Sequence, residues 1–244
     1  MNICLFTEEE CTRIIPRKDE RAEHIIKVLH KNTGDSFDAG IIGGKAGKAT
    51  ITNISNEGIS FSFVPESDGK PLYPLTLIIG FPRPIQLRRL LRDVAGLGAE
   101  QVILVGTELG EKSYLKSNVV QDGGAYQMLL DGTAQAASTH IPELSVEESL
   151  EKALSRLQDF APDSALVALD NRRATNSLSK WLNQTNPNKV VAAIGSERGW
   201  TEHERDILER YGFTLCSMGT RVLRTETATT VASSIILDKF GVLN

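Results

Sequence analysis

The 244-residue sequence has few cysteines and no apolar run approaching the length of a membrane-spanning helix, which is about 20 residues. Its three cysteines, Cys4, Cys11 and Cys216, are an odd number and widely scattered, with no CxxC pair. Neither a disulfide framework nor a zinc site shared with the four histidines fits this spacing. We therefore expect free thiols in a reducing compartment and no metal centre.

Several familiar motifs are also missing. The start, "MNICLFTEEE", lacks the basic and apolar segments of a signal peptide, so a cytoplasmic location is expected. No G-x-G-x-x-G follows a predicted strand, and no G-x-S-x-G occurs. The glycine-rich stretch 39–50 lacks the first glycine of a phosphate loop and has Ala49 after Lys48, where Ser or Thr is needed. A hairpin turn explains those glycines better.

The charge balance is slightly acidic, with a net charge of −4, which by itself disfavours a nucleic-acid partner. Basic residues are nevertheless concentrated in two places. Residues 11–50 hold eight Lys or Arg against five Asp or Glu, and "GFPRPIQLRRLLR" (80–92) holds four arginines and no acid. Solvated surfaces would explain both clusters equally well. If RNA is the partner, the predicted phosphate contacts are Arg13, Arg17, Lys18, Arg21, Arg83, Arg88, Arg89 and Arg92.

The pattern of apolar residues changes at a linker predicted at residues 64–74, "VPESDGKPLYP", which has three prolines. The part before it, residues 1–70, is predicted to be a small β-rich domain. Short alternating strands there suggest a small barrel, because a barrel leaves no sheet edge exposed. The expected elements are a helix at 24–30 and strands at 35–42, 48–54 and 58–64.

The part after the linker, residues 74–244, alternates continuous apolar runs with helical patterns. This alternation is typical of an α/β domain with a largely parallel sheet. Predicted strands lie at 75–81, 101–105, 164–170, 189–195 and 213–219. Predicted helices lie at 85–98, at about 125–137, within 145–158, at 201–212 and from 225 onward.

The glycine-bearing turns after the last two predicted strands are candidates for a ligand site. The first contains Gly195 and Gly199 and enters a helix through a capping box formed by Thr201 and Glu204. The second, "CSMGTRVLRTETA", also turns into a helix. In a parallel sheet such turns lie at the carboxyl ends of the strands, where ligands bind. For either turn alone, a glycine that merely ends a strand is the simpler explanation.

Two segments together resemble a known signature: "RVLRTETA" (221–228), preceded by "MG", and "IGSERGWTEHE" (194–204). They are similar to the C-terminal signature of the RsmE family, SPOUT-class methyltransferases that methylate N3 of a uridine in bacterial 16S rRNA. The resemblance extends over nearly the whole chain. It implies a PUA-like RNA-binding barrel, a trefoil-knotted methyltransferase domain, S-adenosylmethionine as cofactor, the small ribosomal subunit as partner and a homodimer.

The resemblance also implies which residues form the site. Arg224 would face the uracil or a phosphate, and Glu226 would fix that arginine or the partner subunit. An ion pair between Arg221 and Glu226 is the structural alternative. The cofactor would be held, mainly through backbone groups, by Ile194, Gly195, Ser196, Glu197, Gly199, Met218, Gly219, Val222, Leu223 and Arg224, with Leu169 and Asp170 as a weaker contribution.

The chain departs from the family pattern in its first cofactor loop. Ser196 replaces a proline, which is expected to loosen the turn, and Arg198 replaces a glycine that could adopt positive φ. Arginines of the family are also replaced, by His30, by Lys112 with Ser113, and by Ser138 or Thr139. Two other readings stay open: a ribosome-binding protein whose pocket Arg198 blocks, and a methyltransferase acting on a different RNA.

Overall fold

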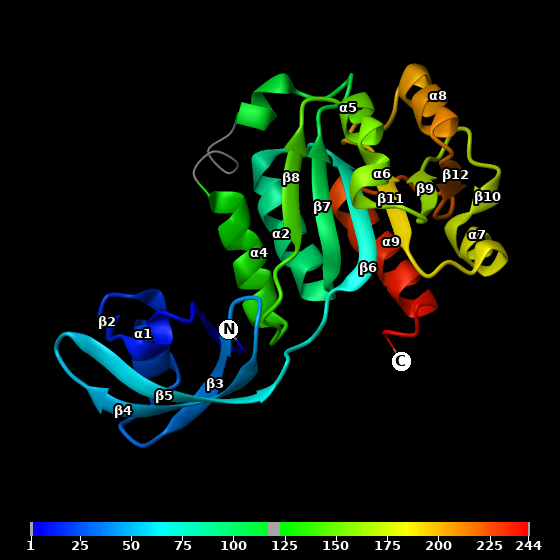
Figure 1. Cartoon of the computed structure of the whole chain (residues 1–244). Coiled ribbons are helices and arrows are strands. Elements are labelled where there is room, and N and C mark those ends of the chain that lie inside the picture. Colours follow the sequence, from blue (N-terminus) through cyan, green and yellow to red (C-terminus); the bar gives the residue numbers. More distant parts are fainter. Residues whose placement is uncertain (1, 117–122, 244) are drawn as a thin grey trace. The chain divides into compact units, whose positions relative to one another are not determined.

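The computed structural model describes residues 2–116 and 123–243, which form two compact units (Figure 1). The first consists of residues 1–71 together with 130–141, and the second of residues 72–129 together with 142–244. Among the described residues, no helix has the length and apolar character needed to cross a membrane. Each unit contains its own sheet.

The first unit is built on a five-stranded sheet of order β1-β3-β4-β5-β2. β1 pairs parallel with β3, and the other pairs are antiparallel. The rings of Phe6, Phe37 and Phe61 pack together at its centre, with centroids 4.7 to 6.4 Å apart. Its strands are β1 (Cys4–Phe6), β2 (Ile15–Pro16), β3 (Ser36–Ile41), β4 (Ala46–Ile54) and β5 (Gly58–Ser67). Its helical segments are η1 (Glu10–Thr12), α1 (Glu20–Glu23) and the π-helical turn η2 (His24–Val28).

The predicted linker is partly strand. β5 continues to Ser67, and the next strand begins at Tyr73. Pro65 is accommodated because the ladder shifts register between Ala46 and Gly47, and Gly47 pairs with the proline. A β-bulge of this kind is one of the few places where a strand accepts proline.

The second unit contains a seven-stranded sheet of order β10-β12-β9-β11-β6-β7-β8, in which every pair is parallel. The predicted α/β class with a parallel sheet is confirmed. The strands are β6 (Tyr73–Gly80), β7 (Ala99–Val105), β8 (Glu143–Glu147), β9 (Ala165–Leu169), β10 (Asn176–Ser177), β11 (Val190–Ile194) and β12 (Thr214–Ser217). The helical segments are α2 (Pro84–Leu97), η3 (Lys112–Lys116), α4 (Gly124–Gln135), α5 (Leu150–Ser155), α6 (Leu157–Phe160), α7 (Leu178–Thr185), α8 (Glu202–Arg210) and α9 (Thr225–Lys239). From Leu130 onward, α4 is grouped with the first unit.

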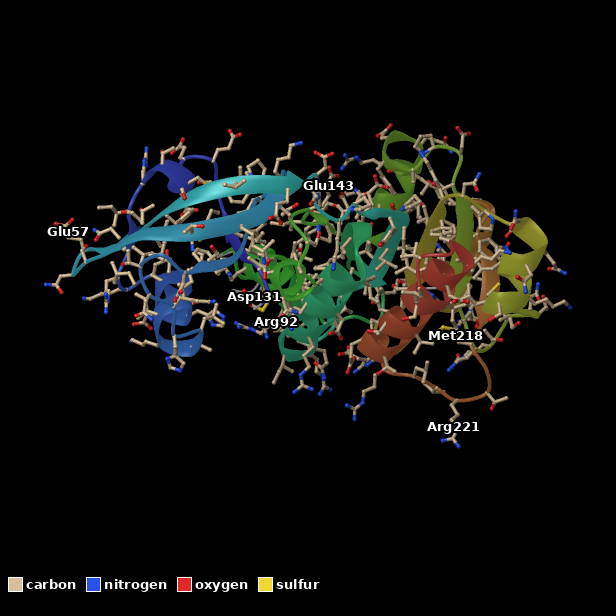
Figure 2. All side chains as sticks on the ribbon, turned by 90° about the horizontal axis from the view of Figure 1, so that it is seen from below. Glu57, Arg92, Asp131, Glu143, Met218 and Arg221 are labelled. Carbon is tan, nitrogen blue, oxygen red and sulfur yellow. The ribbon has the colours of Figure 1, made fainter. Side chains whose placement is uncertain are left out.

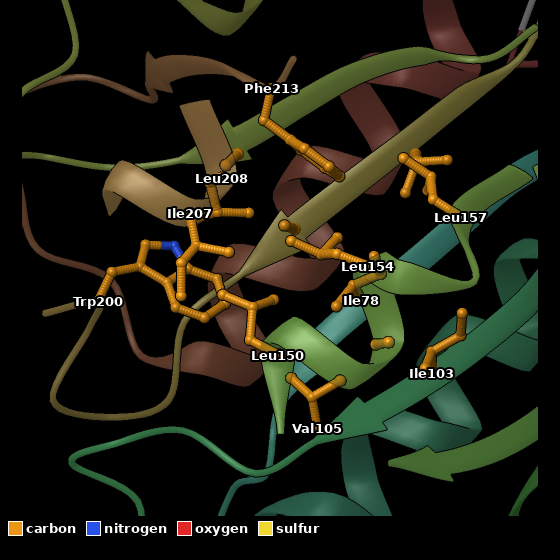
Figure 3. Packing of buried hydrophobic residues seen from close by; sticks show 14 of the residues in the cluster. Ile78, Ile103, Val105, Leu150, Leu154, Leu157, Trp200, Ile207, Leu208 and Phe213 are labelled. Atoms are coloured by element: carbon orange, nitrogen blue, oxygen red, sulfur yellow. The ribbon is translucent and has the colours of Figure 1, made fainter. Parts of the chain in front are cut away.

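Helices cover both faces of this sheet (Figure 1). On one face, α5, α6 and α8 enclose a cluster in which Ile78 of β6, Leu154 of α5 and Leu208 of α8 are buried (Figure 3). On the other, α9 packs against α2 and against β6 and β11. This burial on both sides explains why β6 and β11 have the continuous apolar sequences expected of central strands.

The edges of the sheet contain the elements that the sequence did not predict. β8 has the polar sequence "ELSVE" and pairs only with β7. Its residues 145–147 fall within the helix predicted at 145–158, so that part of the prediction is wrong. β10 is two residues long, and α7 follows it. The Ser177 side chain accepts a hydrogen bond from the backbone N–H of Lys180, which is an N-cap signal visible in the sequence.

Candidate active site

A pocket of about 430 Å³ lies at the carboxyl ends of three neighbouring strands, β9, β11 and β12. The loops that follow these strands, with residues of α8 and α9, form its wall. Eleven of the twelve predicted cofactor residues line it: Leu169, Asp170, Ile194, Gly195, Ser196, Glu197, Gly199, Met218, Gly219, Val222 and Leu223. Arg224 does not. The pocket therefore joins residues that are well separated in the sequence.

The loop after β11 is a tight turn. The backbone N–H of Gly199 donates to the carbonyl oxygen of Ser196 at 2.8 Å. Gly199 has a φ of +70°, whereas Arg198 is not among the residues with positive φ. Arg198 therefore does not occupy a position that needs positive φ, because the next residue provides the left-handed conformation.

Ser196 fixes this turn against the ends of β6 and β7. Its hydroxyl accepts a hydrogen bond from Thr107 Oγ1 at 3.1 Å, and the side chain is 6% exposed. A Cβ on Gly80 would lie 2.4 Å from the backbone nitrogen of Ser196, so only glycine allows this approach. The Ser196 hydroxyl thus anchors this turn. The replacement of the family's proline by Ser196 was expected to loosen it.

Glu197 connects the same turn to α2. Its Oε1 accepts a hydrogen bond from the backbone N–H of Arg83, the N-cap residue of α2, at 3.0 Å. The Arg83 guanidinium lies 3.9 Å from the same oxygen. A carboxylate is favourable at a helix N-terminus because the helix dipole is positive there. Glu197 and the predicted phosphate ligand Arg83 therefore contact each other.

The start of α8 is held by the predicted capping box, which the structure confirms. Thr201 Oγ1 accepts from the N–H of Glu204, and the Glu204 carboxylate accepts from the N–H of Thr201. Glu108 adds a second carboxylate, which accepts from the Thr201 hydroxyl and pairs with His203. The hydrogen bonds from Thr201 and His203 lower the pKa of Glu108, and the bond to Glu108 raises the pKa of His203.

A buried ion pair lies in the pocket wall. Arg205 Nε is 2.7 Å from Asp170 Oδ2, and the two side chains are 3% and 2% exposed. Asp170 Oδ1 also accepts from the backbone N–H groups of Arg172 and Arg173. Burial opposes ionisation of Asp170, but these backbone hydrogen bonds and the Arg205 guanidinium outweigh it and lower the pKa.

Sequence reasoning missed Arg205, although a signal was present. Arg205 lies on the buried side of α8 with Ile207 and Leu208, and a charged residue on an apolar helix face requires a partner. The other pocket residues outside the prediction are Asn171, Arg172, Arg198, Trp200, Cys216, Arg221, Thr225 and Ala228.

Two hydrogen bonds connect the loops to one another. Trp200 Nε1 donates to the carbonyl oxygen of Leu169 at 3.1 Å, linking the loop after β11 to the end of β9. Thr225 Oγ1 donates to the carbonyl oxygen of Gly195 at 3.1 Å, linking α9 to the same loop. The first turn of α9 is thereby attached to the pocket by a threonine that is 3% exposed.

The loop after β12 is the exposed part of the wall. Val222 is 80% exposed, and Figure 2 shows Arg221 projecting from the outer end of this loop. Arg224 is the N-cap residue of α9 and is exposed, while Glu226 is half-buried in the first helical turn. Among the described residues, Arg221 and Glu226 form no ion pair. The alternative interpretation, that an ion pair between them ties α9 to the loop, is therefore wrong.

The predicted phosphate ligands are divided between the two units. On α2, Arg88, Arg89 and Arg92 are exposed. In the first unit, Lys18 is exposed, Arg13 pairs with Glu9, and Arg17 donates to the carbonyl oxygen of Ser55.

Arg21 has a structural role in the first unit. Its guanidinium pairs with Glu10 at 2.6 Å and with Asp19 at 2.8 Å, and it stacks over the ring of Phe6 at 4.9 Å. These contacts satisfy its donors, so among the predicted RNA contacts Arg21 is the least available to a phosphate.

Metal and thiol chemistry find no support in the described part of the chain. No group of three or more His, Cys, Asp or Glu side chains there could hold a metal ion. Burial raises the pKa of the Cys216 thiol, which lines the pocket, to about 11. A thiol with that pKa stays protonated near neutral pH and is a poor nucleophile.

The comparisons with known proteins agree with this geometry. A profile of the RNA methyltransferase domain matches residues 68–237. The chain is 40% identical to Ribosomal RNA small subunit methyltransferase E of Treponema pallidum, covering 97% of this chain and 91% of that protein. It is 31% identical to Ribosomal RNA small subunit methyltransferase E 1 of Borreliella burgdorferi, covering 98% of each.

A solved structure has the same fold. Ribosomal RNA small subunit methyltransferase E of Neisseria gonorrhoeae, determined with bound S-adenosyl methionine, superposes with a TM-score of 0.79 at 20% identity, covering 98% of this chain and 97% of that one. Together, the profile match and the two similar sequences establish that the chain belongs to the ribosomal RNA small subunit methyltransferase E (RsmE) family.

Proposed function

We propose that this protein is an S-adenosylmethionine-dependent methyltransferase that methylates N3 of a uridine in the 16S rRNA of the small ribosomal subunit. One observation carries the proposal: eleven residues predicted from sequence to hold the cofactor line one pocket. Its volume of about 430 Å³ is within the range of small-molecule sites, roughly 300 to 1,000 Å³. Family membership supplies the reaction.

The donor fits the chemistry of this pocket. S-adenosylmethionine supplies an electrophilic methyl group on a sulfonium, and no metal or activated thiol is needed to transfer it. Peptide groups at Gly195, Gly199 and Gly219 can approach a ligand closely because glycine has no Cβ. Ser196 and Thr225 hold the loop after β11 in place through hydrogen bonds. The donor would therefore meet a wall that is largely preformed.

Methylation of uracil N3 has two further requirements, access to the base and removal of the N3 proton. Uracil N3 lies on the Watson–Crick edge, so the target base must be unpaired or flipped out. N3 must also lose its proton, and a nearby cation favours the uracil anion. Arg224, exposed at the N-cap of α9, would provide this cation or contact a phosphate. Glu226, one turn into the same helix, would position Arg224 or contact the partner subunit.

The larger assembly follows from the family resemblance. Residues 1–70 would form a PUA-like barrel that binds RNA, and residues 74–244 a SPOUT domain whose trefoil knot brings the pocket loops together. A homodimer would complete the active site, and the protein would act in the cytoplasm. The five-stranded sheet of the first unit and the parallel sheet of the second are compatible with these two domain types.

Calorimetry and methyl transfer test the proposal together. The protein should bind S-adenosylmethionine and transfer a labelled methyl group to unmodified small ribosomal subunits, and primer extension should stop at the methylated uridine. Naked 16S rRNA and tRNA serve as alternative substrates. A protein that binds subunits but not the donor would be the ribosome-binding homologue, and preferential methylation of tRNA would identify a different RNA target.

Replacing Arg224 by Ala tests the assigned catalytic residue. We expect methylation to fall below detection while donor affinity and folding remain, because Arg224 is exposed and does not line the pocket. The Arg224→Lys variant keeps the charge and should retain part of the activity. Full activity of Arg224→Ala would remove this residue from the mechanism.

A further inference from the structure

Three arginines of the pocket wall have unpaired side chains. Arg172 follows β9, Arg198 follows β11 and Arg221 follows β12, so each belongs to a different loop. All three are exposed, and none of their guanidinium groups forms a hydrogen bond or ion pair with a described residue. Their guanidinium groups are therefore available to solvent or to a bound molecule.

The neighbouring arginines show the contrast. Arg205 lines the same pocket but pairs with Asp170 and Glu202. Arg173, adjacent in sequence to Arg172, contacts Glu202, Asp206 and Glu209 of α8. A structural role for an arginine in this region is thus recognisable by its carboxylate partners, and Arg172, Arg198 and Arg221 have none.

The charges of the pocket do not balance. Four arginines and two carboxylates line it. Asp170 is neutralised by Arg205, and Glu197 accepts from the N-terminus of α2. The three remaining arginines give the mouth of the pocket an uncompensated positive charge, which attracts anions and repels cations over several ångströms.

The methyl donor does not explain this charge. S-adenosylmethionine has a sulfonium, an ammonium and one carboxylate, so its net charge is positive. Its carboxylate could use one arginine, but further arginines would repel the molecule. RNA has the opposite character, with one negative charge on each phosphate. Arginine suits it because the planar guanidinium can donate two parallel hydrogen bonds to a phosphate.

We propose that Arg172, Arg198 and Arg221, here called the arginine rim, bind the phosphates of the RNA strand on either side of the target nucleotide. This inference rests on the proposed function. It places the RNA strand at the mouth of the pocket that is proposed to hold the methyl donor. Contacts to the flanking phosphates would hold the strand while the base between them enters the pocket. In Figure 2 the Arg221 side chain extends beyond the ribbon, where a strand can reach it.

Binding measurements on arginine variants test the arginine rim. The variants are Arg172→Ala, Arg198→Ala and Arg221→Ala, singly and together, and Arg210→Ala is the matched control because Arg210 is exposed on α8 outside the pocket. Filter binding to a labelled 16S rRNA transcript is measured over a range of salt concentrations. Calorimetry with S-adenosylmethionine is measured in parallel, and circular dichroism checks folding.

We expect each single substitution to raise the RNA dissociation constant about tenfold, which corresponds to losing one charge-assisted contact. Each should also reduce the slope of log affinity against log salt by roughly 0.7, the value for one phosphate of a single strand. Donor affinity should stay the same or increase, since a positive charge is removed. Arg198→Lys should recover part of the RNA affinity, and Arg210→Ala should behave as the wild type.

The outcomes separate this inference from the proposed function. If the wild type binds the donor but the rim variants bind RNA normally, or no worse than Arg210→Ala, the arginine rim is refuted and the methyltransferase stands. If the variants lose donor affinity and keep RNA affinity, the arginines serve the donor, and the inference is again wrong. If the wild type binds RNA through the rim but not the donor, the proposed function fails instead.

Discussion

The loops after β11 and β12 line the same pocket but are held very differently. In the loop after β11, a hydrogen bond between Gly199 and Ser196 closes the turn, and the Ser196 hydroxyl is anchored to Thr107. The loop then enters α8 through its capping box. From Met218 to Leu223 the second makes no side-chain hydrogen bond or ion pair with any other described residue. One wall is fixed by the fold, and the other has few internal constraints.

In the proposed function, this difference would allow a single pocket to serve two ligands. A preformed wall spares a ligand the entropy cost of ordering it, which suits a small donor molecule. A loop with few contacts opens at low free-energy cost and can adapt to an RNA strand. The following substitutions test whether the first wall is the rigid one, beginning with the largest expected effect.

Removing Asp170, which follows β9 and pairs with Arg205 of α8, should have the largest effect on stability. Asp170→Ala leaves the buried Arg205 guanidinium with only the exposed Glu202 carboxylate as partner, and breaking a buried ion pair costs about 3 to 5 kcal/mol. The free energy of unfolding in urea measures this loss. The double variant Asp170→Ala, Arg205→Met should recover much of it, because no charge is then left buried. Equal instability of the single and double variants would show that packing, not charge, is responsible.

Adding a methyl group at Gly80 should displace the turn after β11. The new Cβ would lie 2.4 Å from the Ser196 nitrogen, and overpacking of this kind costs about 1 to 3 kcal/mol. Donor affinity, measured by calorimetry, should fall with stability. Gly44→Ala is the control, since its nearest neighbour would be 3.5 Å away. Unchanged donor affinity in a destabilised Gly80→Ala protein would mean that the turn does not shape the pocket.

Two threonine substitutions compare the loops directly. Thr201→Ala removes the N-cap of α8 and should cost about 1 kcal/mol. Thr220→Ala, in the exposed loop after β12, should change stability by less than about 0.5 kcal/mol. Thermal unfolding followed by circular dichroism measures both. If Thr220→Ala were the more destabilising, the assignment of rigid and open walls would be reversed.

The contact between His203 and Glu108 should make stability depend weakly on pH. The pKa of His203 is raised in the folded state, so its contribution is fully present below the unfolded pKa of about 6.5 and is lost as pH rises through the folded value. The pKa of Glu108 is lowered, so its contribution is present above its unfolded pKa, near 4.3, and is lost as pH falls through the folded value.

Comparison with His203→Gln isolates this effect. The difference in melting temperature between wild type and variant should be largest at about pH 5 to 6 and should shrink as the pH rises through the raised pKa of His203. A difference independent of pH would indicate that packing of the imidazole, rather than its charge, stabilises α8. Because both groups are exposed, salt should also reduce the difference.

The local features of the second unit were predictable where a short sequence pattern determines them. The capping box needs only Thr201 and Glu204 in one helical turn, and the central strands are recognisable because burial on both faces demands continuous apolar runs. The edge strand β8 was not predicted, because its glutamates and serine are also compatible with a helix start. Its conformation is imposed by pairing with β7.

By itself, the sequence determined the α/β class, the positions of most strands and helices, and many of the residues that line the pocket, because these depend on local periodicity, turn chemistry and a specific signature. Only the tertiary structure decided that Ser196 is anchored by Thr107, that Asp170 is paired with Arg205, and that three pocket arginines have no side-chain partner among the described residues. These are relations between segments far apart in the chain, and they arise only when the strand order of the sheet brings their ends together.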